Sequence, residues 1–219
     1  MKILLLGATG RTGRQIIEEA LKSGHSVSAI VRDPEKLKEY KIEITQGTPY
    51  DYETVEKAIA GCNAVVNTLN VSRKTENPWS PLRAPKDLIS KSADNAIKAM
   101  ENIGIKRFVA LSTIGAGRSW KKSPAILKLI VSLSNLKYAF QDHGKQEKIL
   151  ENSFADYTIC RAPMLSNELH EAGAIASPEG VRPADKYLSR NAAAKFFLKI
   201  IEDNMYIRST ISLSNKSVN

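Results

Sequence analysis

The chain has 219 residues, 42% hydrophobic and 25% charged, a composition typical of a globular protein with a buried core. The two cysteines, Cys62 and Cys160, are too few and too far apart for a disulfide framework or a zinc site. No apolar run reaches the ~18 residues of a membrane span. We therefore expect a cytoplasmic protein without metal or membrane partner. The net charge of +9 could indicate a polyanionic partner such as nucleic acid, but the sequence has no helix-turn-helix or RNP motif. The basic stretch 118–148 is therefore expected to be a solvated face or a rim around an anionic small molecule, and not a nucleic-acid site.

Short β-rich segments alternate with helical patterns along the chain. The β-rich segments are residues 2–6, 25–31, 41–46, 63–69, 106–112 and 156–161, and most suit burial on both faces. The helical patterns are residues 11–24, 51–62, 85–104 and 144–153, with Gly24, Gly61 and Gly104 near three of their ends, where left-handed C-caps are favoured. An irregular segment from Leu165 to Leu188 is followed by a helix at 189–203, with Ser189 as N-cap, and a strand at 208–214.

Strands that alternate with helices must pair in parallel through right-handed crossovers. We therefore predict a single α/β domain over residues 1–219, a doubly wound parallel sheet of the Rossmann type. Residues 165–188 are expected to form part of a small, irregular C-terminal substrate lobe.

Three glycines separate the first strand from the first helix in the sequence GATGRTG. Gly7, Gly10 and Gly13 precede a helix N-terminus, whose free N–H groups and partial positive charge attract phosphate. A pyrophosphate fits there only if the backbone is bare, so the pattern predicts dinucleotide binding. The alternative is a turn that merely packs the helix on the sheet. A Walker A loop is excluded, because Gly13 is followed by Arg14 and Gln15 where Lys and Ser or Thr would be needed.

The second strand is followed by VRDPEKL, which bears on the choice of cofactor. A carboxylate here commonly binds the ribose 2′-OH of NAD, whereas arginine accommodates the 2′-phosphate of NADP. Arg32 and Lys36, with Arg11 from the glycine loop, favour NADP over NAD. In the alternative, Arg32 is solvated and Asp33 binds the ribose.

The motifs GATGRTG, VRDPEKL, AIAGCNAVVNTL, KRFVALST and FADYTICRAP together resemble the atypical short-chain dehydrogenase/reductases. The resemblance is greatest to their NAD(P)H-binding group around biliverdin reductase B (flavin reductase) and the NmrA-like proteins, and it covers Met1 to about Leu165. It implies NADP bound across the carboxyl ends of the strands. The sequence departs from the family at Gly47-Thr48, where Gly-Asp is usual, and at Asn70, where glycine is usual.

The resemblance assigns cofactor contacts to four groups of residues. The phosphate loop is Gly7, Thr9, Gly10, Arg11, Thr12 and Gly13; the 2′-phosphate pair is Arg32 and Lys36; the adenine side is Tyr50 and Asp51; the nicotinamide side is Leu69, Asn70, Ser112, Thr113, Pro163, Met164 and Leu165.

The catalytic device of ordinary short-chain dehydrogenases is missing, because no tyrosine is followed four residues later by lysine. A hydride acceptor that needs no strong protein acid fits better, such as a flavin, a quinone or a linear tetrapyrrole. Ser112 and Thr113 are expected to orient the nicotinamide or the substrate, and His143 to donate a proton near neutral pH or, alternatively, only to line its helix. Trp79 either stacks on a flat substrate or lies in a plain surface loop.

Two functions follow from this sequence. The first is an NAD(P)H-dependent reductase that acts on a small molecule as a monomer or weak homodimer. The second is a non-catalytic, NmrA-like protein that senses NADP(H), which the missing tyrosine–lysine pair equally permits.

Overall fold

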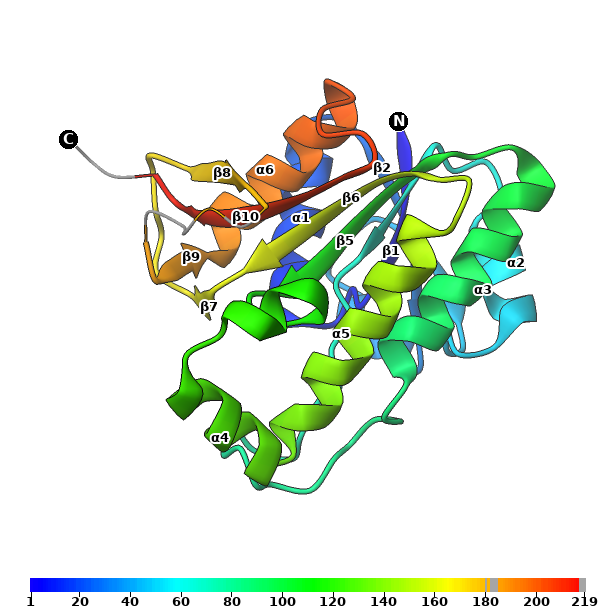
Figure 1. Cartoon of the computed structure of the whole chain (residues 1–219). Coiled ribbons are helices and arrows are strands. Elements are labelled where there is room, and N and C mark those ends of the chain that lie inside the picture. Colours follow the sequence, from blue (N-terminus) through cyan, green and yellow to red (C-terminus); the bar gives the residue numbers. More distant parts are fainter. Residues whose placement is uncertain (180, 182–184, 217–219) are drawn as a thin grey trace.

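An eight-stranded sheet covered by helices on both faces forms the centre of the computed structural model, which describes residues 1–179, 181 and 185–216 (Figure 1). The strand order is β3 (Glu43–Gln46), β2 (Ser26–Val31), β1 (Lys2–Leu6), β4 (Ala64–Asn67), β5 (Arg107–Thr113), β6 (Asp156–Ala162), β10 (Ser209–Asn215) and β8 (Ala174–Pro178). Neighbouring strands are parallel except β8, which runs antiparallel to β10. The predicted doubly wound α/β fold is therefore confirmed.

Each face of the sheet has its own apolar core, because successive side chains of a strand point to opposite faces. In β1, Ile3 and Leu5 pack in the core beneath α1 (Arg11–Lys22) and α6 (Arg190–Glu202). Leu4 and Leu6 pack in the other core, beneath α2 (Tyr52–Ala58), α3 (Leu88–Ile103) and α5 (Leu136–Glu151). Burial on both faces explains why this strand is an unbroken apolar run in the sequence.

The predicted helix ends are confirmed at Gly24 and Gly104, whereas α2 ends at Ala58, before Gly61, and one predicted helix start is wrong. Gly24, Gly61 and Gly104 have φ angles of 75°, 69° and 75°, the left-handed conformation expected at helix C-termini. The helix predicted from residue 144 begins instead at Leu136, and the preceding helix α4 (Ala125–Leu133) was not expected. In both helices the burial pattern is unusual, because α5 buries polar side chains such as Asp142 and Glu147, and α4 exposes apolar ones such as Leu129.

The segment predicted to be irregular contains three short strands. β7 (Met164–Ser166) pairs in parallel with β9 (Tyr187–Ser189), and β8 extends the main sheet. The expectation of an irregular segment is thus wrong for these residues, while residues 180 and 182–184 lie outside the described part. Ser189 does precede α6, but its hydroxyl donates to the Glu168 carbonyl at 2.6 Å rather than capping the helix.

No helix among the described residues is long and apolar enough to cross a bilayer. Two 3₁₀ helices, Pro34–Leu37 and Gly117–Lys122, complete the secondary structure that surrounds the site.

Candidate functional site

The glycine loop joins β1 to α1, and its three glycines have different surroundings. Gly7 has a φ of +89°, and a Cβ there would lie 2.9 Å from the Thr68 carbonyl carbon at the end of β4. A Cβ on Gly13 would lie 2.3 Å from the Gly7 carbonyl oxygen. These two glycines are thus required by the packing of the loop itself.

Gly10 differs, because the protein does not fill the space beside it. Its φ is −74°, which any residue adopts, and a Cβ would meet only the Gly7 carbonyl oxygen, at 3.1 Å. Gly10 and its neighbours Thr9 and Arg11 are exposed, whereas Thr12 and Gly13 are buried. The bare backbone at Gly10 therefore faces open space at a helix N-terminus, which fits the pyrophosphate of a dinucleotide.

The residues after β2 bear on the 2′-phosphate prediction. Asp33 is occupied locally: its Oδ1 accepts from the Glu35 amide at 3.3 Å and its Oδ2 lies 3.7 Å from Lys36 Nζ. Arg11 forms an exposed ion pair with Glu76 at 3.0 Å. Arg32 is exposed and makes no ion pair within the described residues. Asp33 and Arg32 are both exposed, so the choice between the 2′-phosphate and the ribose 2′-OH stays a prediction.

A cleft of about 1160 Å³ opens at the carboxyl ends of β4, β5 and β6. The structure brings together at this cleft every residue predicted for the nicotinamide side, and also His143 from α5. These residues are Leu69, Asn70, Ser112, Thr113, Pro163, Met164 and Leu165. In a doubly wound sheet this edge is the position at which ligands bind.

The adenine-side prediction concerns residues outside the cleft. The Tyr50 hydroxyl donates to Asp87 Oδ2 at 3.1 Å, just before α3. Asp51 is exposed and immediately precedes α2, without capping it through its side chain. Their contact with adenine stays a prediction.

Ser112 is less free than predicted, because its hydroxyl belongs to a buried ionic network. Ser112 Oγ donates to Glu147 Oε1 at 2.7 Å, and that carboxylate also accepts from Arg161 Nε at 2.9 Å and Nη2 at 2.8 Å. The Glu147 and Arg161 side chains are each only 2% exposed. Because the Ser112 hydroxyl already donates its proton to Glu147, Ser112 can only accept a hydrogen bond from a ligand.

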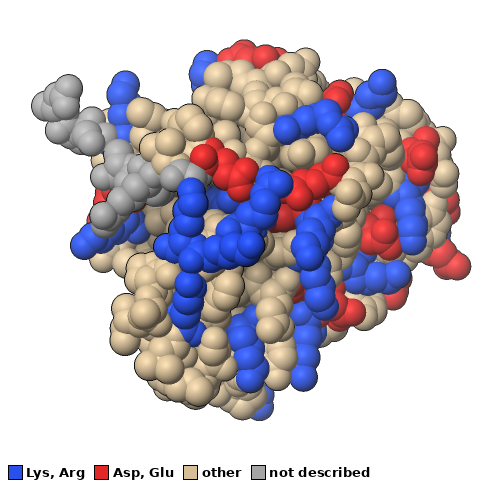
Figure 2. Space-filling view, viewed as in Figure 1, with Lys and Arg blue, Asp and Glu red and all other residues tan. Residues whose placement is uncertain are grey.

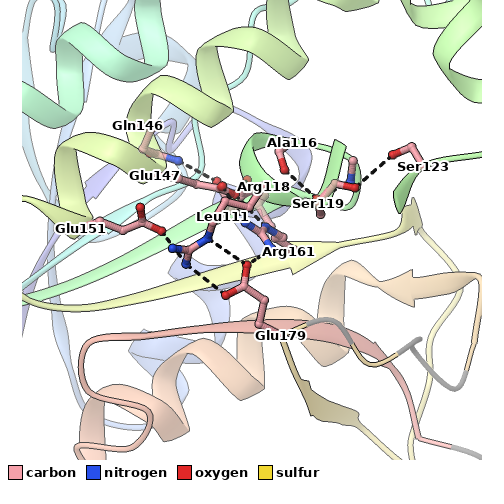
Figure 3. Close-up of polar contacts among 12 residues, drawn as sticks. Leu111, Ala116, Arg118, Ser119, Ser123, Gln146, Glu147, Glu151, Arg161 and Glu179 are labelled. Atoms are coloured by element: carbon pink, nitrogen blue, oxygen red, sulfur yellow. Dashed lines mark hydrogen bonds and ion pairs between the residues drawn. The ribbon is translucent and has the colours of Figure 1, made fainter. Parts of the chain in front are cut away.

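Figure 3 shows how this network continues toward the surface. Arg161 Nη1 donates to Glu179 Oε1 at 2.8 Å, and Arg118 connects Glu179 to Glu151 at 3.1 and 3.0 Å. Burial alone would lower the pKa of Arg161, but the hydrogen bonds and negative charges of Glu147 and Glu179 outweigh it and raise that pKa. The guanidinium is therefore a fixed positive charge behind the cleft.

Sequence reasoning missed Glu147 and Arg161. A signal was present, since an arginine inside the apolar strand DYTICRA must find a buried partner if the strand is covered on both faces. The partner itself lies on α5 and could not be identified from the sequence.

His143 lines the cleft, where the sequence suggested either a proton donor or a residue that only lines its helix. The side chain is buried, and its Nδ1 has no hydrogen-bond partner within the described residues. Burial lowers the pKa of His143 to about 4. A lowered pKa favours the neutral imidazole and so does not support proton donation near neutral pH, which stays a prediction.

Two other side chains near the site have hydrogen-bond partners within the protein. Asp142, next to His143, accepts from the Ile89 amide at 2.7 Å and from the Ser90 hydroxyl, and so caps α3. Trp79 is not among the cleft residues; its indole N–H donates to the Leu133 carbonyl at 3.0 Å, at the end of α4. Within the described residues, no group of three metal-binding side chains occurs.

A Rossmann sheet, a glycine loop open at Gly10 and a cleft at the carboxyl edge define a nicotinamide-dinucleotide-binding protein. The chain belongs to the NAD(P)H-binding family, whose model matches residues 7–204. Solved structures with a similar fold include short-chain dehydrogenase/reductases and a Rossmann-fold NAD(P)-binding protein.

Three proteins with a similar sequence or fold share 30% identity or less with this chain. The chain is 30% identical over 224 residues to the photosystem II assembly factor Ycf39 of Guillardia theta, covering 97% of this chain but 64% of that protein. The chain thus spans just under two thirds of this relative. Its fold is similar to that of ChuY, an anaerobillin reductase from Escherichia coli O157:H7, with a TM-score of 0.81 and 19% identity over 100% of this chain and 99% of the other.

A short-chain dehydrogenase/reductase from Veillonella parvula, solved in complex with NADP, is also similar, with a TM-score of 0.76. It shares 19% identity, over 97% of this chain and 94% of the other. At these identities the solved structures establish the fold alone.

Proposed function

We propose that this protein is an NADPH-dependent reductase of a flat, conjugated acceptor such as a flavin, a quinone or a linear tetrapyrrole. The observation that carries the proposal is the cleft, where the predicted nicotinamide-side residues line a space of about 1160 Å³. Ligand pockets typically measure about 300–1,000 Å³. The space therefore admits a second ring system beside a nicotinamide.

The cofactor proposed is NADPH in preference to NADH. Gly10 and the N-terminus of α1 would hold the pyrophosphate, and Arg32, Lys36 and Arg11 the 2′-phosphate. When bound, this cofactor supplies the hydride. The local engagement of Asp33, by the Glu35 amide and Lys36, supports this preference over a ribose contact of Asp33.

The lining of the cleft favours an acceptor that joins an apolar ring system to an anionic group. Apolar side chains such as Phe140 and Leu127 line it together with Arg73, Lys122 and Lys186, against the single acidic residue Asp185. A phosphate, as in FMN, or the carboxylates of a linear tetrapyrrole would pair with these cations. An uncharged quinone would leave them without a counter-ion.

Proton delivery falls to water in this proposal. The tyrosine–lysine device is absent, and a pKa of about 4 for His143 leaves its imidazole neutral at pH 7, so it is a hydrogen-bonding group and not a strong acid. The acceptor gains a hydride from the cofactor and a proton from solvent. The contribution of the chain is positioning, with Thr113 at the end of β5 as a hydrogen-bonding group in the cleft and Ser112 as an acceptor.

A second candidate is a non-catalytic protein that senses NADP(H), in the manner proposed for NmrA-like proteins. It is favoured by one observation: neither side chain offers an acidic proton at neutral pH, because the His143 imidazole is neutral and the Ser112 hydroxyl already donates to Glu147.

The test is the consumption of NADPH by the purified protein with FMN, FAD, a quinone and biliverdin, measured at the absorbance of the cofactor. We expect turnover with at least one acidic acceptor and a slower reaction with the quinone. Calorimetric NADPH binding without reduction of any acceptor above the enzyme-free rate would reject the reductase and leave the sensor.

We further propose that the protein acts in the cytoplasm, as a monomer or weak homodimer, on a small molecule and not on nucleic acid. Cys62 and Cys160 are free and buried, in keeping with a reducing compartment.

A further inference from the structure

Helix α4 carries an apolar outer face. Its sequence is AILKLIVSL, yet Val131 is its only buried residue. Four large side chains spaced along one face are exposed to solvent: Ile126 (65%), Leu129 (56%), Ile130 (37%) and Leu133 (66%). A surface helix normally turns charged residues outward. The outer face of α4 is therefore not adapted to water.

Trp79 extends this face. It is 59% exposed, and the hydrogen bond from its indole N–H to the Leu133 carbonyl fixes it at the C-terminal end of α4. We call the five residues Trp79, Ile126, Leu129, Ile130 and Leu133 the α4 patch. A contiguous exposed apolar patch of this kind marks an interaction site.

The surroundings of the patch are basic. Between residues 113 and 141 the sequence contains Lys121, Lys122, Lys128 and Lys137 and no aspartate or glutamate; Arg118, also in this stretch, is paired with Glu151 and Glu179. The next acidic residues, Asp142 and Glu147, are buried in hydrogen bonds to α3 and Arg161. In Figure 2 the lower left part of the surface, where Figure 1 places α4, is mostly tan and bordered by blue side chains.

We propose that the α4 patch docks on the surface of an anionic lipid bilayer. The aliphatic side chains would enter the boundary between headgroups and acyl chains, and the lysines would meet the lipid phosphates. Trp79 suits this boundary, because its ring is apolar while its N–H is satisfied. The helix lies on the membrane in this arrangement and does not cross it.

Charge decides between a bilayer and a second copy of the chain. A symmetric contact through this face would bring the basic stretch 113–141 of two copies toward each other. The stretch offers no acidic residue to compensate its lysines. An anionic bilayer supplies an apolar phase and negative charge together, so it complements both properties of the surface.

The test is sedimentation of the full chain with vesicles of phosphatidylcholine alone or with about one third phosphatidylglycerol. We expect binding to the anionic vesicles only, and its loss at about 0.5 M NaCl, where surface charges are screened. Leu129→Glu should lower the partition coefficient at least about tenfold. Ile103→Glu, at an exposed position at the end of α3, makes the same change in charge and should lower it no more than about twofold.

Fluorescence tests insertion independently. Trp120→Phe leaves Trp79 as the only tryptophan. Its emission should shift to the blue, and lipids with brominated acyl chains should quench it, only when anionic vesicles are present.

Three outcomes would overturn the proposal. The first is no binding to anionic vesicles at low salt. The second is an equal loss of binding in Leu129→Glu and Ile103→Glu, which would mean adsorption by net charge alone. The third is a lipid-free dimer that Leu129→Glu dissociates, which would make a second copy the occupant. Both variants must keep the wild-type melting temperature and NADPH affinity; if Leu129→Glu does not, Leu129→Ser replaces it.

Discussion

Alanine substitutions at Gly10 and Gly13 should separate the part of the glycine loop that builds the fold from the part that binds the cofactor. A Cβ on Gly13 would lie 2.3 Å from the Gly7 carbonyl oxygen and 2.8 Å from Ala8 Cα, both backbone atoms that cannot move alone. A Cβ on Gly10 would meet only the Gly7 carbonyl oxygen, at 3.1 Å, and Gly10 already has a φ of −74°.

The expected magnitudes follow from these contacts. Gly13→Ala is an overpacking change against backbone and should cost about 3 kcal/mol or more of unfolding free energy. Gly10→Ala should cost no more than about 1 kcal/mol, because the poorer N-cap is partly offset by the lower entropy of the unfolded chain. Its methyl group instead occupies the space proposed for the pyrophosphate. Loss of charge-assisted hydrogen bonds worth about 1.5–3 kcal/mol corresponds to about 10–150-fold weaker NADPH binding.

The assay combines urea unfolding of both variants with calorimetric titration of NADPH. Gly10→Ala should unfold near the wild-type midpoint and bind NADPH weakly, and Gly10→Val should bind it more weakly still. Gly13→Ala should unfold at clearly lower urea. Wild-type NADPH affinity in a folded Gly10→Val protein would refute the phosphate assignment, and a Gly13→Ala variant as stable as wild type would refute the packing argument.

Three other predictions follow from the site. Arg32→Asp should reduce a preference for NADPH over NADH of about 10–150-fold to parity or invert it; an unchanged ratio of dissociation constants would place the 2′-phosphate elsewhere. His143 has a folded-state pKa of about 4 against 6.5, so the unfolded chain takes up its proton first as pH falls. Unfolding free energy should therefore drop by up to about 3 kcal/mol between these pH values, and His143→Leu should lack that component; parallel pH profiles would contradict the burial argument. Glu147→Ala leaves the Arg161 guanidinium buried without its main partner and should cost about 3–5 kcal/mol in urea unfolding, much of it restored by adding Arg161→Met; a loss below about 1 kcal/mol would contradict this account.

The features that could be predicted from the sequence are those that local patterns determine. The apolar run of β1 indicates a strand buried on both faces, and Gly104 indicates the end of α3, because each depends on neighbouring residues only. The nicotinamide-side residues meet at one cleft because parallel strands end at the same edge of a sheet.

The features that could not be predicted depend on contacts between distant residues. Ser112 pairs with Arg161 across β5 and β6, and Glu147 reaches both from α5, an arrangement that requires the strand register. The pKa of His143 follows from the depth of its burial, which the residue type alone does not reveal. Helix α4 was missed because its outer face has the apolar residues that an amphipathic pattern reserves for the core.

Helix α4 connects the two proposals, because its residues face in two directions. Leu127 and the preceding Pro124 line the cleft, whereas Leu129 and Leu133 lie in the α4 patch. Of the neighbouring lysines, Lys122 lines the cleft and Lys128 is tied by its ammonium to the Lys121 carbonyl at 3.0 Å. In the two proposals, lysines of the stretch 113–141 therefore bind an anionic acceptor inside the cleft and lipid phosphates outside it. A bilayer that held the outer face of α4 would also steady one wall of the cleft, so docking would bear directly on how the acceptor is positioned.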